Sequence, residues 1–217
     1  MPGRLNIFQR TMLQWNALHP YNAIHVVRLP GAPDLAKLGN VIRHILVRLG
    51  LTGLELDVQR NVFSYQGGPP QCEIKVASGT DPNAALIAEI ELQLNTRFEI
   101  RQAINPFRFF VVPDLDSFSL GLVYFHPVAD AEAVVFLLKR MVEAYLAQDD
   151  SAVEPVDLYP EPRDGLLRRP GLLLKKLAAL PGLMRNLRRS NRPNYHNPQD
   201  TRNGFTFFFF PRIVFPD

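Results

Sequence analysis

Apolar residues recur at helical spacing in three stretches of the chain, and polar signals mark where these stretches start or stop. Asp34 stands where an N-cap is expected, and Gly50 follows the last residue of the same apolar face. Pro82 stands at the start of the second stretch, where a missing backbone N–H costs nothing. The pattern therefore predicts amphipathic helices over residues 35–49, 82–95 and 134–147.

Short runs rich in branched and aromatic residues lie between the helices and predict strands. A Gly/Pro-rich turn at 66–70 follows two of these runs and precedes a third, which indicates a meander or a set of hairpins. The runs 104–112 and 117–125 are joined by a short polar link and predict an antiparallel pair. Both are apolar at nearly every position, so we expect each to be covered on both faces in the middle of a sheet. The predicted strands are 22–29, 54–58, 61–65, 72–77, 104–112 and 117–125.

The last third of the chain has a different character. Four prolines between residues 155 and 170 indicate a linker. A basic segment at 163–192 begins within this linker and continues beyond it. That segment holds nine Lys or Arg and one acid, so the other residues, with 15 bases and 20 acids, carry a net charge of −5. The basic balance is therefore local, and it does not indicate a nucleic-acid partner.

Leucines interleave with the charges of the basic segment and predict one or two helices interrupted at Pro181. Such a helix either docks on the protein by its leucines or contacts an anionic membrane surface or an acidic partner. Residues 203–215 begin as a strongly apolar strand. A Phe-rich strand left unpaired at a sheet edge favours association with another chain.

Composition limits the class of protein. The 217 residues are 47% hydrophobic, which is enough for a sizeable core. Cys72 is the only cysteine, so an internal disulfide is excluded and a reducing compartment fits. The sequence has no signal-peptide core and no stretch approaching the roughly 20 apolar residues that span a bilayer. We therefore expect a cytoplasmic protein, with peripheral membrane attachment through residues 163–192 as an alternative.

The segment most suggestive of chemistry is 117–138, SFSLGLVYFHPVADAEAVVFLL, in which a strand runs through a turn into a helix. His126 stands at the turn, where an imidazole with an ordinary pKa near 6.5 can act as a base. Asp130 can cap the following helix or pair with Arg108 on the neighbouring strand, since a buried arginine needs a partner. We favour the ion pair, which makes Asp130 a support for the turn. His25 and His44 are interpreted as structural.

The spacing of His126 and Asp130 is by itself a weak motif, because a histidine and an acid four residues apart occur often by chance. Other chemistries have less support. The sequence has no glycine-rich phosphate loop, no Gly-x-Ser-x-Gly, no His-Glu-x-x-His and no Cys and His cluster with ligand spacing, so no metal site is expected.

The run from PFRFFVV to LGLVYFHPVADAEAVVFLL resembles the N-terminal lobe of the acyltransferase superfamily that includes peptide-synthetase condensation domains and chloramphenicol acetyltransferase. The family signature, His-His-x-x-x-Asp-Gly, follows a strand and opens a helix. His126 and Asp130 match its second histidine and its aspartate, whereas Phe125 replaces the first histidine and Ala131 the glycine. NAIHVVRLPGAPDLAKL is similar to the family's opening strand and helix, so the likeness covers roughly residues 15–147. It implies an α/β fold of the α+β two-layer kind, with helices packed on a mixed, mostly antiparallel sheet.

The resemblance also implies a reaction. His126 would be the general base that takes a proton from an acceptor hydroxyl or amine, as the acceptor attacks a thioester of coenzyme A or of a phosphopantetheinyl carrier protein. Asp130 and Arg108 would support the site, and neither a metal nor a permanently bound cofactor is implied. The candidates for the substrate channel are Tyr124, Phe125 and Ala131.

Condensation-type members of the family have two similar lobes with the active site in the tunnel between them. This chain resembles the first lobe over residues 1–150, and residues 151–217 lead toward a second lobe. We therefore expect an acyltransferase lobe completed by a second lobe, which another chain or self-association through the C-terminal strand would supply. The alternative is a non-catalytic fragment or binding module of the same fold, whose partner would be an acyl carrier protein or another chain.

Overall fold

A computed structural model describes residues 2–69, 72–100, 103–147 and 158. The predicted linker, basic segment and Phe-rich strand of residues 151–217 lie outside this part of the chain, apart from Leu158. The elements are β1 (Pro2–Arg4), α1 (Ile7–Leu18), β2 (Asn22–Pro30), α2 (Leu35–Arg48), β3 (Leu54–Asp57), β4 (Val62–Tyr65), β5 (Ile74–Val76), α3 (Pro82–Asn95), β6 (Phe107–Pro113), β7 (Ser117–Phe125), a 3-10 turn η1 (His126–Val128) and α4 (Ala131–Ala147).

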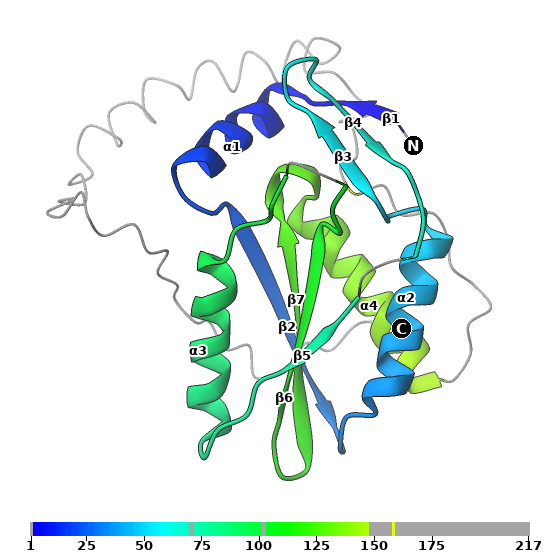
Figure 1. Cartoon of the computed structure of the whole chain (residues 1–217). Helices are drawn as coiled ribbons and strands as arrows, with labels where there is room; N and C mark the ends of the chain where they lie inside the picture. Colours follow the sequence, from blue (N-terminus) through cyan, green and yellow to red (C-terminus); the bar gives the residue numbers. More distant parts are fainter. Residues whose placement is uncertain (1, 70–71, 101–102, 148–157, 159–217) are drawn as a thin grey trace, which may run out of the picture. The chain divides into compact units, whose positions relative to one another are not determined.

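Within the described residues, the main sheet has four strands in the order β2-β7-β6-β5 (Figure 1). β7 is antiparallel to both β2 and β6, and β5 runs parallel to β6. β6 and β7 lie in the middle of the sheet, as their nearly unbroken apolar sequences predicted. The mixed, mostly antiparallel sheet with helices packed on it confirms the predicted fold class.

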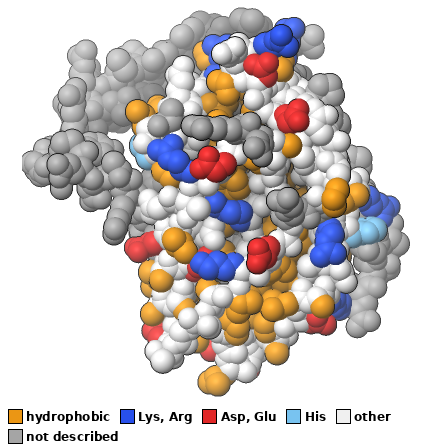
Figure 2. All heavy atoms as spheres, in the orientation of Figure 1, with side chains coloured by type: hydrophobic (Ala, Val, Ile, Leu, Met, Phe, Trp, Pro, Cys, Tyr) orange, Lys and Arg blue, Asp and Glu red, His pale blue; other side chains and the backbone are white. Residues whose placement is uncertain are grey.

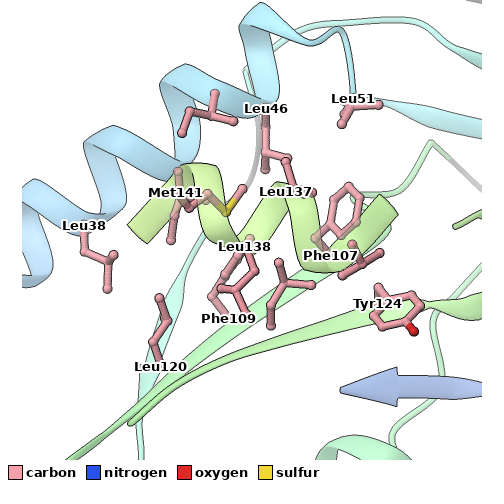
Figure 3. Close-up of a cluster of buried hydrophobic side chains, with 14 of the residues drawn as sticks. Leu38, Leu46, Leu51, Phe107, Phe109, Leu120, Tyr124, Leu137, Leu138 and Met141 are labelled. Atoms are coloured by element: carbon pink, nitrogen blue, oxygen red, sulfur yellow. The ribbon is translucent and has the colours of Figure 1, made fainter. Parts of the chain in front are cut away.

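Helices cover both faces of the main sheet and create two cores. α2 and α4 pack on one face, and α3 covers the other (Figure 1). Successive side chains of a strand point to opposite faces, so Phe109 and Val111 enter the first core while Phe110 and Val112 enter the second. No helix in the described residues is long and apolar enough to cross a membrane. The first core, part of which Figure 3 shows, includes Leu38, Leu46, Phe107, Phe109, Leu120, Tyr124, Leu137, Leu138 and Met141.

The region between α2 and α3 differs from its prediction. β3 and β4 form the predicted antiparallel pair, but they belong to a separate small sheet of order β1-β4-β3. β5 is not part of a meander with them, because it joins the main sheet parallel to β6. Parallel strands need a crossover connection, and α3 provides it between β5 and β6.

The N-terminal helix α1 was not predicted, although its start can be read from the sequence. Asn6 Oδ1 accepts from the backbone N–H of Gln9 at 3.0 Å, and Gln9 Oε1 accepts from the backbone N–H of Asn6 at 2.9 Å. This capping box satisfies two N–H groups that a helix start otherwise leaves without partners. α1 packs against η1, so it lies next to the turn that carries His126.

Acidic and basic side chains are interspersed on the face of the molecule shown in Figure 2. Lys75 on β5 and Glu89 on α3 form an ion pair with 2.6 Å between Nζ and Oε2. Gln93 donates to the other carboxylate oxygen of Glu89 at 2.7 Å. Glu89 is 4% exposed, and these two partners offset the cost of burying its charge.

Replacing a glycine by alanine should have opposite effects on stability at positions 121 and 39. Gly121 on β7 lies opposite Phe110 on β6, and a Cβ at position 121 would overlap the Phe110 ring. Gly121→Ala is therefore expected to lower the free energy of unfolding by about 1–3 kcal/mol. Gly39 in α2 has neighbouring side chains no closer than 3.8 Å to such a Cβ, so Gly39→Ala should stabilise by about 0.5–1 kcal/mol. Urea denaturation of the two variants measures both effects, and equal shifts would contradict the prediction.

Candidate functional site

His126 lies at the junction where β7 ends and η1 leads into α4. The His126 backbone N–H donates to the carbonyl oxygen of Tyr21, just before β2, at 3.3 Å. The Asp130 backbone N–H donates to the carbonyl oxygen of Leu158 at 2.9 Å. These bonds tie both ends of the turn to other parts of the chain and give it a defined conformation.

The orientation of the His126 imidazole bears directly on its chemistry. Its Nδ1 lies 3.0 Å from the carbonyl oxygen of Ala129. A carbonyl oxygen can only accept, so this bond requires the proton of the neutral ring to be on Nδ1. Nε2 then carries the free lone pair, which is the state in which an imidazole can accept a proton from a substrate.

Aromatic rings hold the half-buried His126 side chain in place. Tyr21 stacks on the imidazole with centroids 5.5 Å apart and planes at 5°. Tyr124 meets it edge to face, with centroids 5.5 Å apart and planes at 77°. Trp15 of α1 meets Tyr21 edge to face, with centroids 5.6 Å apart. The ring is therefore supported by α1, by the residue before β2 and by β7.

Asp130 caps α4, because its Oδ1 accepts from the Ala133 backbone N–H at 2.7 Å. The cap was one of the two roles that the sequence left open. The ion pair with Arg108, which we favoured, is wrong. Arg108 alternates with Phe107 and Phe109 along β6 and so faces the side of the sheet covered by α3, whereas Asp130 begins the helix on the opposite face.

The partner of Arg108 is the C-terminal end of α3. Its Nη2 donates to the carbonyl oxygens of Gln93 at 3.0 Å and Thr96 at 2.9 Å, and its Nη1 to that of Arg97 at 3.3 Å. The guanidinium also lies over the Phe98 ring, 4.1 Å from its centroid. Burial lowers the pKa of Arg108 to about 10, so it stays charged at neutral pH. Arg108 therefore anchors α3, where carbonyl groups lack partners within the helix.

The three predicted channel residues have different surroundings. Tyr124 is 1% exposed and lies in the first core, where burial and the charge of Asp130 raise its pKa to about 12. Phe125 is fully buried in the second core against Phe98. Ala131 is exposed at the start of α4. Tyr124 contacts the His126 ring, whereas Phe125 faces the opposite core, and a channel lined by these residues stays a prediction.

His25 is a neighbour of the site that sequence reasoning missed. The imidazole of His25 stacks on Tyr124 with centroids 5.5 Å apart and planes at 12°. The register of β2 and β7 produces this contact, because Ala23 pairs with Tyr124 and His25 lies two residues further on the same face. The sequence placed His25 and Ala23 on one face, but it did not show that β2 pairs with β7.

His25 should make the stability of the protein depend on pH. Burial lowers the pKa of His25 from its ordinary 6.5, the nearby His126 adds to this effect, and the backbone of Ala131 opposes it. The unfolded chain then binds a proton at higher pH than the folded chain, so the free energy of unfolding falls as the pH drops below 6.5. His25→Phe keeps a ring but binds no proton, so its stability should fall less between about pH 7 and pH 5. Urea denaturation at several pH values measures this, and parallel curves for the two proteins would contradict it.

No group of three or more His, Cys, Asp or Glu side chains within the described ranges is arranged to hold a metal ion.

No protein-family model and no curated protein matches the sequence. Solved structures do match. The starter condensation domain of the rhizomide synthetase RzmA gives a TM-score of 0.58 at 16% identity, over 71% of this chain and 40% of that one. The condensation domain of the Monacolin K polyketide synthase MokA gives 0.53 at 15%, over 89% and 44%. The X-domain from teicoplanin biosynthesis gives 0.55 at 16%, over 89% and 41%.

The chain has a condensation-domain fold. This confirms the resemblance at the level of the fold, and identities this low show no more than the fold. The chain spans about two fifths of the length of these condensation-domain structures. A variant of the RzmA condensation domain was solved in complex with C8-CoA.

Proposed function

We propose that this chain is an acyltransferase module of the condensation type, with His126 as its general base. The observation that carries the proposal is the 3.0 Å contact between His126 Nδ1 and the Ala129 carbonyl oxygen, which leaves Nε2 as a proton acceptor. The condensation-domain fold supports it, and His126 stands where β7 leads through η1 into α4.

In the proposed reaction an acceptor hydroxyl or amine attacks the carbonyl carbon of an acyl thioester. His126 Nε2 takes the acceptor proton as the new C–O or C–N bond forms. The tetrahedral intermediate then collapses, the C–S bond breaks, and the thiolate leaves with the bonding electrons. The imidazolium returns a proton to the thiolate, so the products are an ester or amide and a free thiol, and His126 is again neutral.

The donor class follows from the same proposal. A thioester of coenzyme A is supported by the C8-CoA complex of the RzmA condensation domain. A phosphopantetheinyl carrier protein presents the same thioester and the same arm, so an acyl carrier protein is an equally suitable donor. Both the hydroxyl and the amine remain open as the acceptor.

A second lobe is part of the proposal. The chain spans about two fifths of the condensation-domain structures, and His126 is half-buried within the described residues. We propose that a second lobe, from another chain or a second copy, covers the exposed part of the His126 side chain and excludes water from the thioester. Membrane attachment through residues 163–192 stays a prediction, because that segment lies outside the described residues.

Acceptor-dependent thiol release tests the proposal. The full chain is incubated with octanoyl-CoA, or with octanoyl-pantetheine as a mimic of the carrier thioester, and with a set of alcohols and amines. Thiol release should equal the ester or amide formed, and specific activity should rise with protein concentration if a second copy completes the site. Binding of octanoyl-CoA with no acylated acceptor would contradict catalysis and favour the non-catalytic alternative.

A further inference from the structure

His25 and His126 both contact the Tyr124 ring, with different angles between the ring planes. His25 stacks on that ring, and His126 meets it nearly at a right angle. The two imidazoles therefore share one aromatic neighbour, and any movement of Tyr124 changes the surroundings of both. Tyr124 is 1% exposed, so its ring has little room to move unless one of these neighbours is removed.

Packing alone does not explain a histidine at position 25. Its Nε2 is buried and makes no hydrogen bond with any residue in the described part of the chain, while a hydrogen-bond interaction with the Ala131 backbone at the start of α4 raises the pKa of the ring. A buried polar atom without a partner is destabilising, and a phenylalanine would fill the stack without that cost, although it would lose the interaction with the Ala131 backbone. A polar ring at this place, against Tyr124 and close to His126, indicates a role in the site.

We propose that His25 is a positioning residue for His126, and that in its uncharged form it holds Tyr124 against the His126 imidazole. The proposal rests on the proposed role of His126 as the base. Through Tyr124, His25 helps to keep the His126 ring in the orientation in which Nδ1 meets Ala129 and Nε2 is free. Precise placement of a reacting group contributes strongly to rate, so a residue that never touches the substrate can still control turnover.

The charges around His25 determine how turnover responds to pH. The nearby ring of His126 on η1 lowers the pKa of His25, and the Ala131 backbone at the start of α4 raises it. The Asp130 carboxylate acts on the phenol of Tyr124, which both rings adjoin. A proton on His25 places a second positive charge near the imidazolium that forms on His126 during transfer, which disfavours that imidazolium. Protonation of His25 therefore lowers turnover.

Two substitutions separate the ring of His25 from its charge. His25→Ala removes the stack and should lower kcat by roughly 10-fold to 100-fold with little change in KM. His25→Phe keeps the stack and should restore kcat near neutral pH. As the pH falls, log kcat of the native chain should decline more steeply than that of His25→Phe, because only the native chain can take up a proton at position 25. The substrates are octanoyl-CoA and the acceptor that gives the highest turnover.

NMR of the full chain without substrate supplies a measurement that does not depend on turnover. Two-bond couplings between ring protons and nitrogens distinguish an Nδ1–H from an Nε2–H imidazole, and His126→Gln assigns the signals. The native chain and His25→Phe should show the Nδ1–H form of His126, and His25→Ala a mixture of both forms.

An unchanged His126 tautomer and unchanged kcat in His25→Ala would overturn the proposal. Equal steepness of the two pH profiles would overturn it as well, and this holds even if His25→Ala does not fold. If the native chain transfers no acyl group, the proposed function fails, while the tautomer of His126 in His25→Ala still decides whether His25 positions it.

Discussion

Replacing His126 by glutamine is expected to lower kcat for acyl transfer by about 10²-fold to 10⁴-fold. Glutamine is similar in size, and its amide N–H can still donate to the Ala129 carbonyl oxygen. It cannot take a proton from the acceptor, because an amide is not a base in neutral water. The release of thiol from octanoyl-CoA, measured together with the acylated acceptor, gives the change in rate.

His44→Gln is the matched control for this experiment. His44 is an exposed histidine on α2, outside the cluster of rings around His126, so the same substitution there should leave turnover unchanged. Both variants should unfold at the same temperature as the native chain if they differ from it only in chemistry. Native turnover in His126→Gln would remove the assignment of the base.

The strand, turn and helix around His126 could be predicted because local patterns define them. Apolar residues run without a break to Phe125, and the helical spacing resumes after Asp130. The capping role of Asp130 was also within reach, since an acid at a helix start is a local signal. The orientation of the His126 ring was not, because it depends on the Ala129 carbonyl and on the Tyr21 ring, whose position is set by the fold.

Contacts between distant segments were the part that the sequence could not provide. Arg108 was correctly expected to need a partner, but the partner is a set of carbonyl oxygens at the end of α3 rather than a carboxylate. Backbone acceptors leave no trace in a sequence, because every residue has one. His25 was missed for a related reason, since its role depends on the pairing of β2 with β7 across about one hundred residues.

For the fold, too, local patterns could be predicted from the sequence and contacts between distant segments could not. The central position of β6 and β7 followed from their composition, because a strand that is apolar at nearly every position has to be covered on both faces. The parallel pairing of β5 with β6 did not follow. It requires α3 to cross over a face of the sheet, and a three-residue strand carries too little pattern to show which sheet it joins.

Replacing Arg108 by methionine is expected to lower the free energy of unfolding by about 2–4 kcal/mol. The substitution removes three charge-assisted hydrogen bonds to the end of α3 and the stack on Phe98, while methionine fills similar space. Asp130→Ala removes the cap of α4 and should cost about 1 kcal/mol, whereas Asp130→Asn keeps a capping oxygen and should cost little. Urea denaturation of each variant measures these changes.

The double variant of Arg108→Met and Asp130→Ala tests whether these two side chains stabilise the protein independently. Because the two side chains act on helices on opposite faces of the sheet, their effects should add to within about 0.5 kcal/mol. An ion pair would instead make the second substitution cost much less than it does alone, and Asp130→Asn would then be clearly destabilising although it keeps the cap. Additivity would establish that the arginine strand supports α3, and that the turn carrying His126 is held by its own cap, by Leu158 and by the rings around it.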